Sequence, residues 1–303
     1  MKILVTGGAG FIGSHLVDRL VENGHKVYVL DNLTTGSLNN INKAVTFLEL
    51  DINSKKTLNA ISSIRPEIVF HLAAQVSVQA SIENPVFDGK TNILGSVNLL
   101  KSCVNSGVRK TIFASSAAVY GNPQYLPVNE KHPITPLSFY GASKYASENY
   151  IQVFHHLFKL NYAILRYANV YGPRQSARGE GGVVAKFTEC ILNNKTPKVF
   201  GSGLQTRDFI YVEDIVSANL AALEKPGSQL VNVSTNSATS INHLLEIYGE
   251  VINKKVNACR LNARTGDVMH SRLDNQLAKT ALNWQPDNSL FEGISKTLQG
   301  WNR

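Results

Sequence analysis

The chain has 303 residues, of which 43% are hydrophobic and 17% charged, and its formal net charge at pH 7 is +8. This composition is typical of a globular protein with a large core. No run of residues approaches the ~18 uninterrupted apolar positions of a membrane-spanning helix, so no membrane partner is expected. The lysines and arginines are dispersed and are not interleaved with aromatic residues, which argues against nucleic-acid binding despite the positive charge.

The cysteines and the amino terminus bear on the compartment. Cys103, Cys190 and Cys259 are far apart in the sequence, and the histidines form no ligand motif. We therefore expect reduced cysteines and no metal site. The chain enters a predicted strand at residues 2–5 with no signal peptide before it, which indicates a cytoplasmic protein.

Short apolar runs alternate with amphipathic helical patterns over the first third of the chain. The predicted strands are residues 3–5, 27–30, 45–48, 68–71 and 111–114. A helix is predicted between them from about Ser14 to a stop at Gly24. Continuous apolar strands of this length are typical of a sheet that is buried on both faces. Repeated strand–helix–strand units predict an α/β fold with a doubly wound parallel Rossmann sheet.

The rest of the chain is expected to divide between this sheet and a smaller lobe. A helix is predicted over residues 142–159, followed by a strand at 162–166. The apolar positions of that helix are Ala146, Tyr150, Val153, Phe154 and Leu157. After Asn169, glycine and proline residues mark loops. The predicted division is a nucleotide-binding Rossmann domain of residues 1–169, to which 212–233 return, and a C-terminal α/β substrate-binding lobe of residues 170–211 and 234–303.

A glycine-rich turn follows the first predicted strand. Gly7, Gly10 and Gly13 open a helix, and Asp31 follows at the end of the second strand. In this context the glycines permit the turn, the close approach of the backbone to a pyrophosphate, and tight helix–strand packing. Asp31 would accept hydrogen bonds from the adenosine ribose and would repel a 2′-phosphate, so the predicted cofactor is NAD rather than NADP.

Further cofactor contacts are predicted where other strands end. Asp51 and Ile52 follow the third strand, where the adenine is expected, and the small residues of 72–75 would let the cofactor lie close to the backbone. The set predicted at these strand ends is Gly7, Gly10, Phe11, Ile12, Gly13, Asp31, Asn32, Asp51, Ile52, Leu72, Ala73, Ala74 and Gln75.

Three polar residues carry the predicted chemistry. Tyr140 and Lys144 are spaced so that they share one face of a helix, and Ser116 follows the fifth strand. An ammonium beside a phenol favours the phenolate, so Lys144 is expected to lower the pKa of Tyr140 and make it a usable base. Ser116 can supply a hydrogen bond to the same substrate oxygen.

Several motifs together resemble the extended short-chain dehydrogenase/reductases, and within them the nucleotide-sugar 4-epimerases that act on UDP-glucose and UDP-galactose. The motifs are the glycine turn and residues 71–74, 115–121, 140–144, 166–173, 200–203 and 205–212. The resemblance implies that Tyr140 takes the proton of the sugar 4-hydroxyl while a hydride passes from C4 to NAD. The transient 4-keto sugar would then rotate and be reduced on its other face. Lys144 would also bond the nicotinamide ribose, and Ser116 would assist the proton transfer. The cofactor contacts that the resemblance adds are Asn92, Ser115, Tyr140 and Lys144.

The same resemblance implies a set of substrate contacts and a partner. The substrate residues are Ser116, Tyr140, Asn169, Val183, Phe200, Arg207, Arg264, Asp267 and Ser271. Asn169 and the arginines would hold the UDP diphosphate, and Val183 and Phe200 the uracil. A homodimer is expected through helices near residues 90–105 and 143–159.

Two departures from the wider family bear on specificity. Ala117 and Ala118 stand where sugar-nucleotide dehydratases need an acid and a base, so elimination chemistry is not expected. Ser271 stands where a large side chain would exclude an N-acetyl group, so UDP-GlcNAc and UDP-GalNAc remain candidate substrates. A UDP-glucuronate 4-epimerase or another sugar-nucleotide oxidoreductase of the same fold is the alternative. A non-catalytic NAD-binding sensor is disfavoured, because a sensor does not need Ser116, Tyr140 and Lys144.

Overall fold

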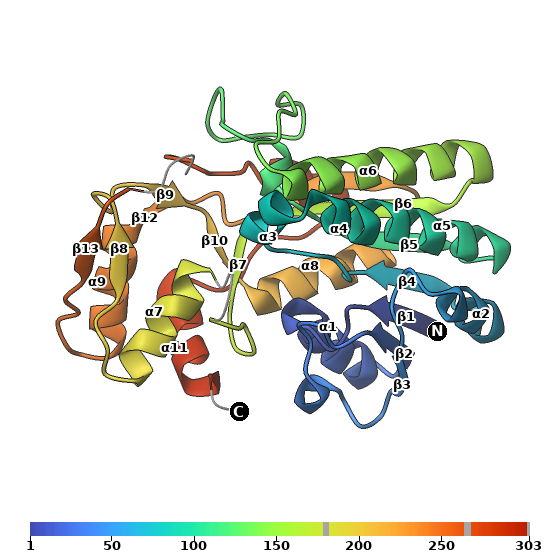
Figure 1. Cartoon of the computed structure of the whole chain (residues 1–303), viewed down its shortest axis with the longest axis horizontal. Helices are drawn as coiled ribbons and strands as arrows, with labels where there is room; N and C mark the ends of the chain where they lie inside the picture. The colour runs from blue at the N-terminus through green and yellow to red at the C-terminus, as the bar shows by residue number, and fades with distance from the viewer. Residues whose placement is uncertain (178–181, 264–267, 302–303) are drawn as a thin grey trace.

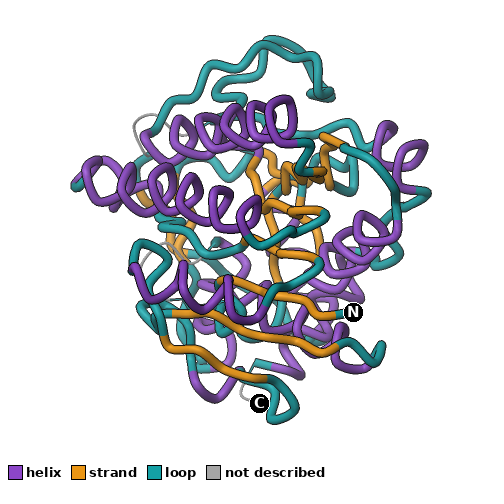
Figure 2. The backbone as a smooth tube through the Cα atoms, turned by 90° about the vertical axis from the view of Figure 1, so that its right-hand side faces the viewer, coloured by secondary structure: helices purple, strands orange, loops and turns teal. Residues whose placement is uncertain are grey.

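One parallel sheet forms the centre of the molecule (Figures 1 and 2). In this computed structural model, which describes residues 1–177, 182–263 and 268–301, seven strands form the sheet in the order β11-β6-β5-β4-β1-β2-β3. The strands are β1 (Lys2–Thr6), β2 (Lys26–Asp31), β3 (Thr46–Glu49), β4 (Ile68–His71), β5 (Lys110–Ser116), β6 (Asn161–Tyr167) and β11 (Gln229–Val233). All neighbouring strands are parallel, so the predicted doubly wound α/β class is confirmed.

Helices bury both faces of the sheet. Ile3 and Val5 of β1 belong to one apolar core, whereas Leu4 between them belongs to another on the opposite face. The face of Ile3 and Val5 is covered by α1 (Phe11–Glu22) and α8 (Val212–Glu224). The face of Leu4 is covered by α2 (Lys55–Ile64), α5 (Gly95–Asn105) and α6 (Phe139–Phe158). Burial on both faces explains why the strands are continuous apolar runs. Of the described helices, none is long and apolar enough to cross a membrane.

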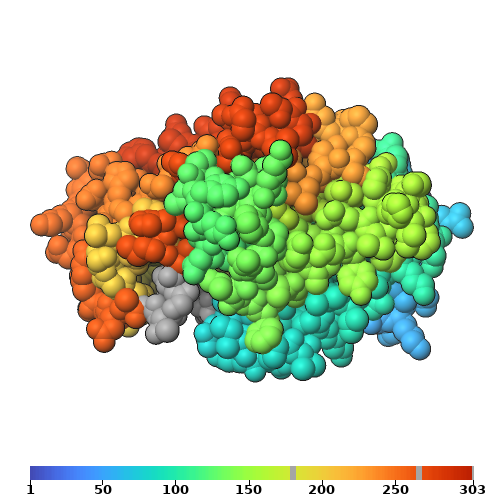
Figure 3. All heavy atoms as spheres, turned by 90° about the horizontal axis from the view of Figure 1, so that it is seen from above, coloured from blue at the N-terminus to red at the C-terminus, as the bar shows by residue number. Residues whose placement is uncertain are grey.

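Short helical segments connect the larger elements. The connection from β4 to α5 contains α3 (Val78–Glu83), α4 (Pro85–Gly89) and the π-helical turn η2 (Lys90–Leu94). The turns η1 (Leu38–Asn40) and η3 (Ala117–Val119) follow β2 and β5. The segment after β5 and helix α6 cover the top of the molecule (Figure 3).

Two helices begin earlier than their apolar patterns predict. Helix α1 begins at Phe11 rather than near Ser14, and the N–H of Ser14 already donates to the carbonyl of Gly10 within the glycine turn (3.0 Å). Helix α6 begins at Phe139 because Ser138 caps it, its hydroxyl oxygen accepting a backbone N–H of the first turn (3.1 Å). The apolar pattern misses both starts because it contains neither the glycine turn nor the cap.

The apolar stripe predicted for α6 faces away from the sheet. The side chains of Tyr150, Val153 and Leu157 are 45%, 51% and 62% exposed, whereas Lys144 and Glu148 are buried. Of the five apolar positions noted in the sequence, these three therefore lie outside the core. Polar side chains with internal partners occupy the buried face of this helix instead.

The smaller lobe lies beside the carboxyl ends of β6 and β11 (Figure 1). Its strands pair as β7 (Asn169–Tyr171) with β10 (Phe209–Tyr211), β8 (Lys198–Phe200) with β13 (Cys259–Leu261), and β9 (Thr206–Arg207) with β12 (Thr239–Ser240). Its helices are α7 (Val183–Leu192), α9 (Ile241–Val251) and α11 (Leu290–Gly300). Helix α10 (Gln276–Leu282) packs instead in the core of the large sheet, next to α8 and β11. The two-domain division itself stays a prediction.

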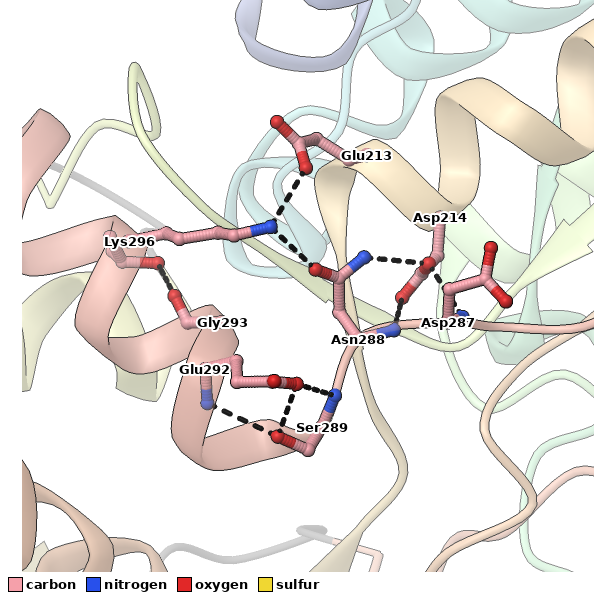
Figure 4. A network of polar contacts seen from close by, with 9 residues as sticks. Glu213, Asp214, Asp287, Asn288, Ser289, Glu292, Gly293 and Lys296 are labelled. Atoms are coloured by element: carbon pink, nitrogen blue, oxygen red, sulfur yellow. Dashed lines mark hydrogen bonds and ion pairs between the residues drawn. The ribbon is translucent and has the colours of Figure 1, made fainter.

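A polar cluster fastens α11 to the start of α8 (Figure 4). The buried carboxylate of Asp214 accepts the backbone N–H of Asp287 (3.0 Å) and the side-chain amide of Asn288 (2.9 Å). Lys296 of α11 donates to Asn288 (2.8 Å) and to Glu213 (3.2 Å). These contacts hold the lobe against the helical layer of the large sheet.

His71 connects β4 to β1, the two neighbouring strands at which the strand order reverses direction. It ends β4, is 3% exposed, and its ring nitrogens lie 2.9 Å from the hydroxyl of Thr6 on β1 and 2.9 Å from the hydroxyl of Ser96 on α5. Burial, with a smaller contribution from the charge of Lys144, lowers the pKa of His71 to about 3. The imidazole is therefore neutral in the folded protein near pH 7.

The neutral His71 predicts a loss of stability in mild acid. Between its unfolded pKa of 6.5 and its folded pKa of about 3, the unfolded state binds one more proton than the folded state, so the free energy of unfolding falls as pH falls. His71 should contribute a loss of about 2 kcal/mol between pH ~7.5 and ~5. Urea unfolding at the two pH values should show a smaller loss for His71→Gln than for the wild type. His156→Gln, at an exposed position of α6, should keep the wild-type loss; equal losses in all three proteins would contradict the assignment.

Candidate active site

The glycine turn packs directly against the end of β4. Gly7 has a φ of +72°, and a Cβ added to it would lie 2.6 Å from the backbone nitrogen of Ala73. A Cβ added to Gly13 would lie 2.1 Å from the carbonyl oxygen of Gly7. Only glycine fits at either position, because a side chain would collide with backbone. Helix α1 begins directly after Gly10. Because Gly10 has no side chain, no cap covers the N–H groups of the first turn of α1.

The side chain of Asp31 fastens this turn to the end of β2. It is 7% exposed, and its carboxylate accepts the N–H of Ala9 (3.0 Å) and of Leu33 (2.8 Å). Next to it, Asn32 donates to the carboxylate of Asp51 (2.8 Å). The predicted adenosine contacts from two strand ends therefore lie together, and Ile52 beside them is buried.

The predicted nicotinamide side of the site is a hydrogen-bonded chain. Asn92, in the π-helical turn, accepts the N–H of Gln75 (2.8 Å) and donates to the hydroxyl of Ser143 on α6 (3.0 Å). Ser143 in turn donates to the carbonyl of Tyr140 (3.1 Å). The structure thus connects the end of β4 to the helix that carries Tyr140 and Lys144.

Ser116, Tyr140 and Lys144 meet between β5 and α6. Ser116 ends β5, and its hydroxyl accepts the N–H of Ala118 (3.1 Å). The ammonium of Lys144 is buried, donates to the carbonyl of Ala114 (2.8 Å), and lies 6.0 Å from the centre of the Tyr140 ring. Burial lowers the pKa of Lys144 to about 8, although the carboxylates of Asp88 and Glu148 act in the opposite direction.

The pKa of Tyr140 corrects one expectation. The sequence predicts that Lys144 lowers it, but in this structure burial raises it, a hydrogen bond with Ser116 lowers it in part, and the charge of Asp88 raises it further. The ammonium of Lys144 is bonded to a backbone carbonyl rather than to the phenol. Burial and Asp88 therefore set the direction of the shift, and Ser116, not Lys144, is the group that opposes it.

Sequence reasoning missed a buried ion pair beside these residues. Glu148, one turn after Lys144 on α6, accepts two hydrogen bonds from the guanidinium of Arg166 on β6 (2.9 and 2.5 Å) and one from the hydroxyl of Ser115 (2.5 Å). Ser115, predicted to contact the cofactor, thus has a protein partner here. Glu148 and Arg166 lie on different elements, so no local sequence signal indicates the pair.

The predicted substrate residues come from several elements of the lobe. Asn169 begins β7 and its amide donates to the carbonyl of Asp208 (3.2 Å). The N–H of Ser271 donates to the carbonyl of Thr206, the residue before Arg207 (3.2 Å). These residues are brought together around β9 and β10.

The other predicted substrate residues are less closely connected to this group. Val183 begins α7 and Phe200 ends β8. Arg264 and Asp267 lie outside the described residues. Among the residues that are described, no group of three or more His, Cys, Asp or Glu side chains could hold a metal ion.

The chain is similar to proteins of one enzyme family along nearly its whole length. The family model described as "NAD dependent epimerase/dehydratase family" matches residues 3–234. A UDP-glucose 4-epimerase from Mycolicibacterium smegmatis is 41% identical over 306 residues, which are 99% of this chain and 98% of that protein. A crystal structure of UDP-glucose 4-epimerase from Thermotoga maritima with UDP-glucose has a TM-score of 0.96 and 45% identity, covering 99% of this chain and 98% of that one. That of the Thermus thermophilus UDP-glucose 4-epimerase with NAD has a TM-score of 0.94 and 39% identity, covering 100% and 99%. This chain therefore belongs to the NAD dependent epimerase/dehydratase family.

Proposed function

We propose that the protein catalyses the NAD-dependent interconversion of C4 epimers of UDP-hexoses, UDP-glucose and UDP-galactose first, through a 4-keto sugar. The observation that carries this proposal is the meeting of Ser116, Tyr140 and Lys144 at the edge of the sheet where the glycine turn also lies. The similarity to UDP-glucose 4-epimerases over 98–99% of both chains supports the same reaction. A cytoplasmic location is part of the proposal, because NAD and UDP-sugars are metabolites of that compartment.

The glycine turn fits a dinucleotide. Gly7 and Gly13 let the backbone pack without side chains, and the N–H groups at the start of α1 suit a pyrophosphate. Asp31 at the end of β2 would bind the adenosine ribose. When bound, NAD supplies the hydride acceptor and donor at C4 of the sugar.

Tyr140 is the proposed acid and base of the reaction. Its phenolate would accept the proton of the sugar 4-hydroxyl and return it after the sugar has rotated. The hydrogen bond from Ser116 is the contact that favours the phenolate, and Ser116 would also hydrogen-bond the same substrate oxygen. Ala117 and Ala118, in the η3 turn after Ser116, cannot move a proton, which agrees with epimerisation rather than elimination.

The lobe would recognise the nucleotide part of the substrate. Asn169 and Arg207 are the proposed diphosphate contacts, together with Arg264, which lies outside the described residues. Asp267, also outside them, is proposed for the uridine ribose. Val183 and Phe200 are proposed for the uracil. The small side chain of Ser271 leaves room for an N-acetyl group, so UDP-GlcNAc is included as a substrate.

A homodimer is also proposed, through the exposed side of α6 as expected, but with the α3–η2 stretch (residues 78–94) beside it in place of most of the expected 90–105. Val153 and Leu157 of α6 are 51% and 62% exposed, and Val86 of α4 is 79% exposed. The two stretches pack side by side on one surface of the molecule (Figure 3). Exposed apolar side chains that gather on one surface favour an interface. A second copy of the chain is the proposed partner.

The function is tested by turnover. Purified protein incubated with UDP-glucose should form UDP-galactose without net consumption of NADH, with the C4 epimers separated by chromatography. UDP-GlcNAc and UDP-glucuronate are assayed in parallel. Tyr140→Phe should lower turnover at least about 100-fold while its bound NAD remains, because it loses only the acid–base group. Tyr150→Phe, on the exposed face of α6, should behave as the wild type. Turnover of UDP-glucuronate alone, or full activity of Tyr140→Phe, would contradict the proposal.

Retention of the cofactor tests the role of Asp31. Asp31→Ala should lose most of its bound NAD during gel filtration, because the ribose would lose its acceptor and the glycine turn its contact through Ala9. The ratio of bound nucleotide to protein gives the measurement. Asp18→Ala, on α1 but bonded to Arg174, serves as the control and should retain NAD. Unchanged NAD content in Asp31→Ala would show that the site is misassigned.

The oligomeric state tests the exposed face. The double variant Val153→Lys/Leu157→Lys should be a monomer by analytical ultracentrifugation, because buried ammonium groups would oppose association. Leu277→Lys, which places the same charge at a 42% exposed site on α10, should leave the dimer intact. A monomeric wild-type protein would rule out the proposed interface.

A further inference from the structure

A buried carboxylate lies beneath the proposed substrate residues. Asp208, between β9 and β10, is 0% exposed. One of its oxygens accepts both the N–H and the hydroxyl of Thr235 (3.0 and 2.7 Å), and the other accepts the N–H of Leu273 (3.2 Å). Thr235 follows β11, and Leu273 lies in the segment before α10. One side chain therefore joins segments that are far apart in the sequence.

Two of these segments carry a residue of the proposed UDP-sugar site, and a third residue of that site bonds to the backbone of Asp208. Arg207 directly precedes Asp208 in the chain. Asn169 donates to the carbonyl oxygen of Asp208 through both its backbone N–H (2.9 Å) and its side-chain amide (3.2 Å). Ser271 lies close to the N–H group that the carboxylate holds, and its own N–H donates to the carbonyl of Thr206 (3.2 Å). The carboxylate thus fixes Asp208 itself and the segment that carries Ser271, and the backbone of Asp208 in turn carries Arg207 and the contacts of Asn169.

We propose that Asp208 is a positioning residue for the substrate, whose carboxylate holds the backbone of Asn169, Arg207 and Ser271 in the arrangement that binds the UDP-sugar. This inference rests on the proposed function. Asp208 is separate from Ser116 and Tyr140, which the proposed chemistry uses. Loss of its charge should therefore raise KM for the UDP-sugar more than it lowers kcat.

The same carboxylate makes substrate binding sensitive to mild acid. Burial raises the pKa of Asp208 to about 6, and the hydrogen bonds to its oxygens act in the opposite direction. The charged or titratable groups next to it along the packed segments are Arg207, His270, Arg272 and Asp274. A protonated carboxyl keeps one good acceptor oxygen instead of two, so it cannot hold both segments equally well. The KM of the wild type should rise as pH falls through this range. The diphosphate of a UDP-sugar does not titrate there.

A matched pair of variants tests the proposal. Asp208→Asn keeps the shape of the side chain and removes its charge and one acceptor oxygen. Asp214→Asn makes the same change at another buried aspartate that holds backbone N–H groups, at the joint with α11 (Figure 4). For UDP-glucose, KM of Asp208→Asn should rise at least about tenfold, with kcat and bound NAD changed little. The KM of Asp214→Asn should stay at the wild-type value.

The remaining outcomes also decide the question. An unchanged KM in Asp208→Asn, or an equal rise in both variants, would overturn the positioning role. If Asp208→Asn does not fold, the KM of the wild type between pH ~7.5 and ~5 decides instead: a rise with a midpoint near 6 supports the role, and a constant KM overturns it. A wild type without turnover of any UDP-hexose would contradict the proposed function itself, and this inference with it. If the wild type turns over UDP-glucose normally, a negative result for Asp208 contradicts only its positioning role and leaves the proposed function intact.

Discussion

The buried ion pair between Glu148 and Arg166 holds together the elements that carry the proposed chemistry. Tyr140 and Lys144 stand on α6, whereas Ser116 ends β5, so their separation depends on how the helix packs against the sheet. The side chains of Glu148 and Arg166 are 0% and 4% exposed. Removing one partner would leave the other charged and buried, a penalty of about 3–5 kcal/mol. Because Ser115 also donates to Glu148, the same carboxylate fixes the end of β5.

The charges around Lys144 explain how an ammonium can be buried beside the phenol. Its one described hydrogen bond goes to a carbonyl, so the surrounding carboxylates provide most of the compensation. Glu148 is neutralised by Arg166, but Asp88 is bonded only to the amides of Gln75 and Asn92. Among the described residues, the second oxygen of Asp88 has no hydrogen-bond partner. The negative charge of Asp88 thus balances Lys144, and it also opposes ionisation of Tyr140.

Local sequence patterns predict the sheet and the glycine turn well because their causes are local. A buried parallel strand must be apolar throughout, and Gly7 is required by backbone that lies within 2.6 Å of its absent Cβ. The orientation of α6 could not be predicted in this way. Its polar residues are buried because Asn92 and Arg166 satisfy them, and both partners come from other elements. Asp208 is likewise invisible to a pattern, since the N–H groups it holds belong to Thr235 and Leu273.

The proposed reaction explains why the cofactor side and the proposed substrate side of the molecule are built from different kinds of contact. The cofactor side is built on backbone contacts that leave no space for adjustment, as at Gly7 and Gly13. The sugar, in contrast, would have to rotate within its site during the proposed reaction, so contacts to the sugar ring have to be few. Substrate affinity must then come from the nucleotide and its diphosphate, at a distance from C4. In the proposed reaction the lobe would provide this through side chains whose backbone depends on Asp208, while the chemistry would depend on α6 and β5. Binding and catalysis would then be supported by separate buried carboxylates, Asp208 for the first and Glu148 for the second.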